Sequence, residues 1–192
     1  MAGVGLPQSE DQFTDARVVG PELHAAEYGF RAGQVLCFDL EGPDYDAWFY
    51  VDFFGADGQV YHLAPNELIE PQQIAAGTRY ELSPGPRFTA NMNASAVARA
   101  CTGAEGDRLP PDSRGFPRLE ILGAQLDVPD GGREFEIVVA YAANTPLPLG
   151  ARPVAEPAGP YLRELEAAIA EARAADPGFK GEWVYFFMVT EG

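Results

Sequence analysis

The sequence contains few of the residues and motifs that perform enzyme chemistry. Its 192 residues include two histidines and two cysteines. No serine lies in a G-x-S-x-G sequence, and no glycine-rich segment continues into the G-K-[ST] of a phosphate-binding loop. The cysteines and the distant histidines do not have the spacing of a zinc site. We therefore expect a protein without enzymatic activity, without a metal and without a cofactor.

Basic residues are absent from one long stretch, because no Lys or Arg occurs between Ala32 and Thr78. The net charge of the whole chain is −16. Such a field repels phosphates, which makes nucleic acid and anionic membranes poor partners. Calcium is an alternative ligand for the acids of this stretch, but their spacing does not fit the D-x-D-x-D-G loop. We predict an acidic face around a solvated turn, formed by Asp39, Glu41, Asp44 and Asp46.

The sequence has no apolar run of the roughly 20 residues that a membrane-spanning helix needs. Its start, MAGVGLPQSEDQF, lacks the basic and apolar regions of a signal peptide. We expect residues 1–15 to be a flexible lead-in, and the chain to be part of a longer protein at the cell envelope, with a cytoplasmic location as the alternative. Cys37 and Cys101 lie in apolar sequence as expected for two buried thiols; the alternative is one disulfide, which would imply an oxidising compartment.

Aromatic residues are concentrated in WFYVDFFGADGQVYHLAP, residues 48–65. The aromatic and β-branched content predicts two strands, and GADG predicts the turn of a hairpin between them. Because side chains alternate along a strand, Phe49, Val51 and Phe53 should face a core. The opposite, amphipathic face of that strand carries Trp48, Tyr50, Asp52 and Phe54. The candidates for a ligand site on the hairpin are Trp48, Tyr50, Tyr61 and His62.

His62 is the histidine with potential partners nearby. A general base needs such a partner within hydrogen-bonding distance, and Asp52 or Tyr50 lies across the hairpin. A structural histidine with satisfied hydrogen bonds is the interpretation that we favour. In APNEL, which follows the hairpin, we expect Asn66 to bond its own backbone in a turn.

The rest of the chain predicts further strands and one helix. REFEIVVAYAA is the clearest of these strands, and the helix begins near Pro160 and ends at DPG, residues 176–178. EWVYFFMVT predicts a final strand, whose continuous apolar run is typical of burial on both faces. This order predicts a mainly β protein, a largely antiparallel β-sandwich over residues 16–192 with one C-terminal amphipathic helix across an opening or an edge. The apolar stripe of the helix consists of Tyr161, Leu162, Leu165, Ala168, Ile169 and Ala172.

The order and spacing of these segments resemble a bacterial family of unknown function, numbered 4384. The resembling segments cover roughly residues 30–192 and include YDAWFYVDFFGADGQVYHLAPN, IAAGTRYEL, REFEIVVAYAANTPL and RPVAEPAGPYLRELEAAI. The resemblance implies a noncatalytic accessory domain, of the kind found beside kinase-like, caspase-like or envelope modules, and it supplies no catalytic residue. One departure is an insert of about residues 91–128 before the REFEIVV strand.

The absence of a catalytic set and the resemblance together favour one function. We expect a noncatalytic recognition or regulatory module that binds a protein partner, and the acidity of the chain allows that partner to be basic. The alternative is a carbohydrate- or small-ligand-binding domain that uses the aromatic surface of the hairpin.

Overall fold

A computed structural model of the chain provides the three-dimensional structure. It describes residues 17–18, 29–31, 38–84, 117–123, 128 and 131–192. The expectations for the lead-in 1–15 and for Cys37 and Cys101 lie outside these residues. Within the described parts, no helix is both long enough and apolar enough to cross a membrane.

The larger of two sheets has seven strands. Its strands pair antiparallel, except that β11 and β2 are parallel. The β4–β5 pair is the predicted hairpin, and Gly58 in its turn has a φ of 80° that favours glycine. The strand order is β10 (Ala155–Pro157), β5 (Gln59–Ala64), β4 (Ala47–Phe54), β9 (Arg133–Ala143), β11 (Gly181–Glu191) and β2 (Gly29–Arg31), with β6 (Gln72–Ile74) paired to β4.

The smaller sheet has four strands, in the order β1 (Arg17–Val18), β3 (Phe38–Glu41), β7 (Arg79–Pro84) and β8 (Arg118–Ile121). Only its β7–β8 pair is parallel. The prediction of a mainly antiparallel β protein with one helix before a final strand is therefore confirmed for the described residues. β8 shows that residues 118–121 of the atypical insert belong to this sheet, whereas most of the insert lies outside the described residues.

The main hydrophobic core fills the space between the two sheets. Phe49, Val51 and Phe53 point into it from β4, as the alternation predicts. The smaller sheet contributes Leu40, Leu82 and Ile121 from the other side.

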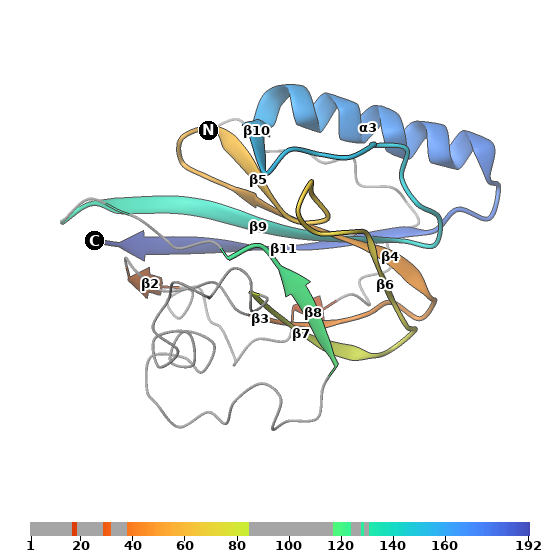
Figure 1. Cartoon of the computed structure of the whole chain (residues 1–192), viewed down its shortest axis with the longest axis horizontal. Helices are drawn as coiled ribbons and strands as arrows, with labels where there is room; N and C mark the ends of the chain where they lie inside the picture. The colour runs from red at the N-terminus through yellow and green to blue at the C-terminus, as the bar shows by residue number, and fades with distance from the viewer. Residues whose placement is uncertain (1–16, 19–28, 32–37, 85–116, 124–127, 129–130) are drawn as a thin grey trace.

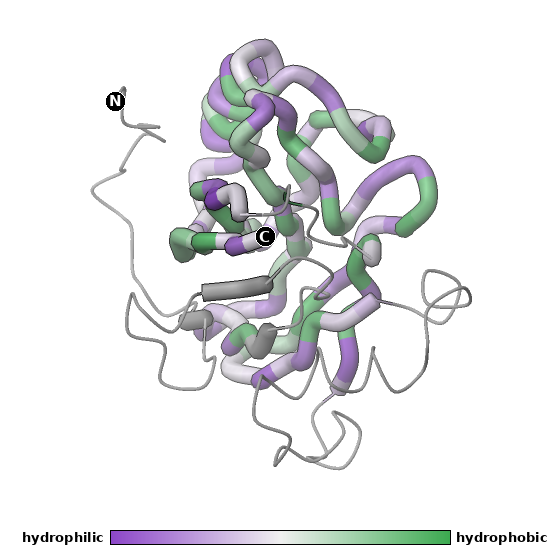
Figure 2. The backbone as a smooth tube through the Cα atoms, turned by 90° about the vertical axis from the view of Figure 1, so that its left-hand side faces the viewer, coloured by the Kyte–Doolittle hydropathy of each residue, from purple (hydrophilic) through white to green (hydrophobic). Residues whose placement is uncertain are grey.

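Helix α3 (Ala158–Ala175) lies across the outer face of the larger sheet, opposite the smaller sheet (Figure 1). Figure 2 shows the helix above the sheets, with hydrophilic and hydrophobic residues around its turns. Its buried residues are Tyr161, Leu165, Ala168, Ile169 and Ala172, which confirms most of the predicted stripe. The expected position across an opening or an edge is wrong, because the stripe packs on the apolar outer face of the sheet in a second core with Phe54, Val60 and Val139.

The last strand, β11, is present as predicted, but its two faces are buried to different extents. Phe186, Met188 and Thr190 are buried on the side of the smaller sheet. Tyr185 and Phe187, on the side of the helix, are exposed. Burial on both faces is therefore a wrong expectation, because α3 covers the middle of β9 and stops short of these two side chains.

Candidate functional site

The four hairpin residues proposed as a ligand site do not come together. Tyr50 packs with the core beneath α3, and Tyr61 packs with the core between the sheets. The two rings therefore lie on opposite faces of the larger sheet. The hydroxyl oxygen of Tyr50 accepts the backbone N–H of Leu147 at 2.9 Å. Trp48 is half-buried and belongs to neither core cluster.

The four positions of the predicted acidic face are divided between β3 and the turn before β4. Asp39 and Glu41 lie in β3, where Glu41 has Arg17 and Arg79 as its neighbours on the flanking strands. Asp44 and Asp46 are exposed in the turn before β4. Within the described residues, no three His, Cys, Asp or Glu side chains are grouped as metal ligands.

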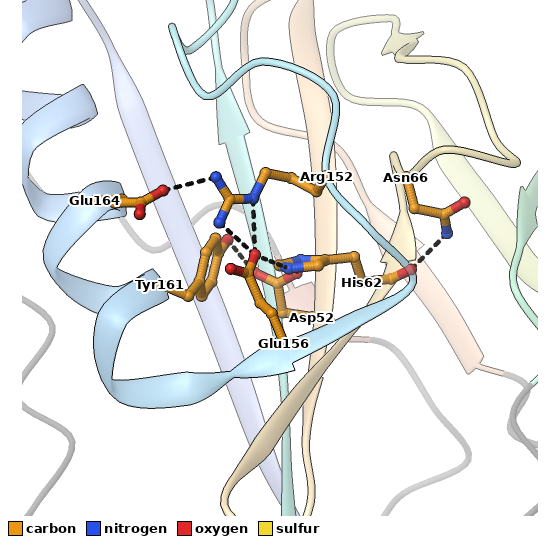
Figure 3. A network of polar contacts seen from close by, with 7 residues as sticks. All are labelled: Asp52, His62, Asn66, Arg152, Glu156, Tyr161 and Glu164. Carbon is orange, nitrogen blue, oxygen red and sulfur yellow. Dashed lines mark hydrogen bonds and ion pairs between the residues drawn. The ribbon is translucent and has the colours of Figure 1, made fainter.

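A buried polar network surrounds His62 instead (Figure 3). His62 is 2% exposed. Its Nδ1 lies 2.7 Å from Oδ1 of Asp52 on β4, and its Nε2 lies 2.8 Å from Oε1 of Glu156 on β10. The predicted contact with Asp52 is thus present, whereas Glu156 lies 94 residues away in sequence. We call the six residues of this network the polar clasp: Asp52, His62, Arg152, Glu156, Tyr161 and Glu164.

The remaining members of the clasp come from α3 and from the segment before β10. Arg152 donates through Nε to Glu156 at 2.8 Å and through Nη1 to Glu164 of α3 at 2.7 Å. Its guanidinium lies 5.4 Å from the ring centre of Tyr161. The hydroxyl of Tyr161 donates to Oδ2 of Asp52, and its ring packs edge-on against His62. The clasp therefore ties two strands of the hairpin to β10 and to the first turns of the helix.

Opposite charges in the clasp stabilise the charged forms of His62 and Glu156. Burial alone lowers the pKa of His62, but its hydrogen bonds and attraction to Asp52 and Glu156 raise this pKa above the usual value of 6.5. Burial alone raises the pKa of Glu156, yet Arg152 and His62 bring it below its usual value. Burial and the neighbouring Asp52 raise the pKa of the Tyr161 hydroxyl well above its usual value. These directions fit an ionised Glu156 between two cations, Arg152 and His62.

The clasp has the geometry of a structural element. Both ring nitrogens of His62 are already bonded to carboxylates, so the ring offers no nitrogen to a substrate. Local sequence reasoning missed Arg152, Glu156 and Tyr161. The sequence carries no local signal for them, because RPVAE is not helical and a spacing of four residues predicts an ion pair only on a helix.

A second feature is an exposed group of aromatic side chains on the outer face of β9 and β11. Phe135 is 65%, Tyr185 48% and Phe187 59% exposed. The Tyr185 ring stacks on Trp183 at 5.2 Å and meets Phe187 edge-on at 5.5 Å. Figure 1 shows the paired ends of β9 and β11 extending beyond the first turn of α3. We call Phe135, Tyr185 and Phe187 the aromatic patch.

Fold and sites together define a two-sheet, mainly β protein with one covering helix, a structural polar clasp and an aromatic patch. No protein-family model matches the chain, and no match was found among curated proteins or solved structures. The resemblance to family 4384 accordingly stays a prediction.

Proposed function

We propose that the chain is a noncatalytic recognition module that binds a protein partner through the aromatic patch. The observation that carries this proposal is the exposure of Phe135, Tyr185 and Phe187 side by side on one sheet face. Among the described residues, the other exposed large hydrophobic side chain is Leu68, in a separate loop. Clustered exposed apolar side chains are typical of interaction sites, and aromatic residues dominate binding energy at interfaces.

Charge favours a basic partner over a second copy of the chain. The net charge of −16 makes two copies repel each other and attracts a cationic partner. The patch itself already holds one cation, because the guanidinium of Arg133 lies 5.2 Å from the ring centre of Phe135. The open rings of Tyr185 and Phe187 are suited to the same contact with arginines of a partner. We therefore propose that the partner segment carries both basic and aliphatic side chains.

The alternative of a carbohydrate or small ligand on the hairpin has less support. Tyr50 and Tyr61 face opposite sides of the sheet, and each hydroxyl is hydrogen-bonded within the chain. A sugar-binding platform needs adjacent open rings with polar groups between them.

Synthetic peptides provide the test. A peptide of alternating Arg and Leu and a matched peptide of Glu and Leu are titrated against the chain by fluorescence anisotropy at low and high salt. The Arg–Leu peptide should bind, the Glu–Leu peptide should not, and salt should weaken the binding. The Tyr185→Ser/Phe187→Ser variant should bind at least about tenfold more weakly, as expected for loss of aromatic anchors.

Leu68→Ser is the matched control, because it removes an exposed apolar side chain outside the patch. It should leave binding unchanged. Equal affinity of the double variant and the unchanged chain would contradict the proposal. Sedimentation that shows a dimer dissolved by the double variant would assign the patch to a second copy, and glycan retention without peptide binding would favour the carbohydrate alternative.

A further inference from the structure

The polar clasp joins separate elements through one titratable ring. His62 belongs to β5, Asp52 to β4 and Glu156 to β10 (Figure 3). β10 leads directly into α3, which begins at Ala158. The state of one imidazole therefore bears on how the β10–α3 segment is attached to the hairpin.

The contacts of His62 fit a doubly protonated ring. Nδ1 and Nε2 face carboxylate oxygens at 2.7 and 2.8 Å. An ionised carboxylate only accepts hydrogen bonds, so both nitrogens must donate, and only the imidazolium has two N–H groups. The same two carboxylates, with Arg152 beside Glu156, make the cation tolerable in a buried position.

Loss of one proton would affect the two contacts unequally. A neutral ring keeps a single N–H, which leaves a nitrogen lone pair against a carboxylate oxygen at the other contact. Oε1 of Glu156 also accepts hydrogen bonds from Nε and Nη2 of Arg152. In Asp52, Oδ2 accepts a hydrogen bond from Tyr161, whereas the donor that the structure places at Oδ1 is Nδ1 of His62. The remaining proton is therefore best placed on Nδ1 beside Asp52, and the contact with Glu156 is the one that is lost.

We propose that His62 is a pH-dependent switch. While its ring is doubly protonated, it holds β10 and the start of α3 on the hairpin, and when Nε2 releases its proton to solvent, this attachment loosens. This inference goes beyond partner binding and does not depend on it. The proton passes to water or buffer, and no other bond forms or breaks.

Beside the apolar packing of α3 on the sheet, few backbone hydrogen bonds among the described residues attach this segment. β10 pairs with β5 over three residues. Beside that pairing, the N–H of His62 donates to the carbonyl of Val154 at 2.9 Å, and that of Glu67 to Arg152 at 2.8 Å. The N–H of Ala158 donates to Gly58 at 3.0 Å. These three amides report directly on whether the segment is attached.

The surrounding charges set the direction of the response. The groups that face the ring or its partners are Asp52 from β4, Arg152 and Glu156 from the β10 segment, and Tyr161 and Glu164 from α3. Burial lowers the pKa of His62, but the two carboxylates raise this pKa by more than burial lowers it. The ring bonded to both carboxylates therefore keeps its second proton to a higher pH than a free histidine. The attachment is complete below the ordinary pKa and is lost as pH rises through the raised one.

Nuclear magnetic resonance tests the protonation state. The chain has two histidines, so the His24→Gln variant leaves His62 as its single imidazole. Its ring nitrogen-15 shifts should show two protonated nitrogens at the pH at which a free histidine is half neutral. A ring with one bare nitrogen at that pH would overturn the proposal.

Amide hydrogen exchange of the unchanged chain tests the loosening. After correction for intrinsic exchange, the opening constants of the His62, Glu67 and Ala158 amides should rise about tenfold per pH unit between the two pKa values. The amide of Gly42, bonded to the Thr78 carbonyl at 2.9 Å in another part of the chain, should show no such slope. If the opening constants of all four amides changed with pH to the same extent, the proposal would be overturned.

Glu156→Gln separates a pH-dependent switch from a merely structural contact. The Gln amide can accept from a protonated Nε2 or donate to a bare one, so the contact survives in both states. The variant should keep the three amides protected and abolish their pH slope, with a lower pKa for His62. If the opening constants of the three amides rose with pH as steeply as in the unchanged chain, the contact between His62 and Glu156 would not be the one lost on deprotonation.

Discussion

The outer face of the larger sheet has a covered and an uncovered half, and the two halves carry their aromatic side chains differently. Tyr161 of α3 is buried between the helix and the covered half of the sheet, and its hydroxyl donates to Asp52. Phe187 is exposed beyond the helix and contacts the ring of Tyr185. Burial of a ring with a satisfied hydroxyl stabilises the fold, whereas an exposed phenylalanine contributes little. The covered half therefore contributes stability, whereas the uncovered half leaves its aromatic side chains exposed.

The largest effect is expected at the centre of the covered half. Asp52→Ala removes an acceptor from both His62 and Tyr161 and leaves the buried imidazolium with one carboxylate partner in place of two. We expect the free energy of unfolding to fall by about 3 to 5 kcal/mol. Urea denaturation measures this fall, with exposed Asp44→Ala as the control. Equal losses in the two variants would show that the clasp does not stabilise the protein.

Truncations in the two halves give the most direct comparison. Leu165→Ala opens a cavity under α3 and should cost about 2 to 4 kcal/mol. Phe187→Ala removes a larger side chain but should cost less than about 1 kcal/mol, mainly the contact with Tyr185. Thermal and urea unfolding of both variants measure the difference. A similar loss for Phe187→Ala would mean that the aromatic patch is covered in solution.

The clasp in the covered half also predicts a pH dependence of stability. The raised pKa of His62 gives stability that is complete below the usual value of 6.5 and is lost as pH rises through the raised pKa. The lowered pKa of Glu156 gives stability that is present above its usual value of 4.5 and is lost as pH falls through the lowered pKa. Clasp stability should therefore be greatest between these two limits.

Unfolding free energies over a pH series check this dependence. His62→Gln should remove the alkaline decline, whereas His24→Gln should retain it. If the two variants showed the same decline, another group would be responsible.

The smallest effect is expected at the rim of the aromatic patch. Arg133 and Glu191 form an ion pair at 3.7 Å, with both side chains more than half exposed. Arg133→Gln should change the free energy of unfolding by at most about 0.5 kcal/mol, because water and salt screen such pairs. The same substitution at Arg152, whose side chain is 14% exposed, should cost more. Indistinguishable losses in urea denaturation would remove the proposed contrast between the halves.

Local sequence patterns predicted the elements and several contacts well. The aromatic strands around GADG are β4 and β5, and the stripe from Tyr161 to Ala172 faces the sheet in α3. Asn66 accepts the N–H groups of Leu68 and Ile69, as expected for a turn asparagine. These features depend on neighbouring residues, which a sequence displays directly.

Features that depend on chain pairing were harder to predict. Phe53 and Tyr61 are directly opposite each other in the hairpin, as counting residues outward from the turn would show. Tyr61 therefore lies on the inner face of the sheet, and Tyr50 lies on the outer face. The pairing of His62 with Glu156 depends on how β10 returns to β5. The exposure of Phe187 depends on where α3 stops covering the sheet, which its own apolar composition does not reveal.

The position of β11 has a consequence for how the chain assembles during translation. β2, near the start of the chain, pairs in the larger sheet with residues 189–191 of β11. β9 likewise has β11 along its full length, from Gly181 to Glu191. Before residues 181–191 leave the ribosome, the edge of β9 that pairs with β11 is open, and β2 lacks its partner in the larger sheet. Chains that lack β11 therefore carry an open edge on β9 that is prone to pairing with other chains, and β11 covers that edge.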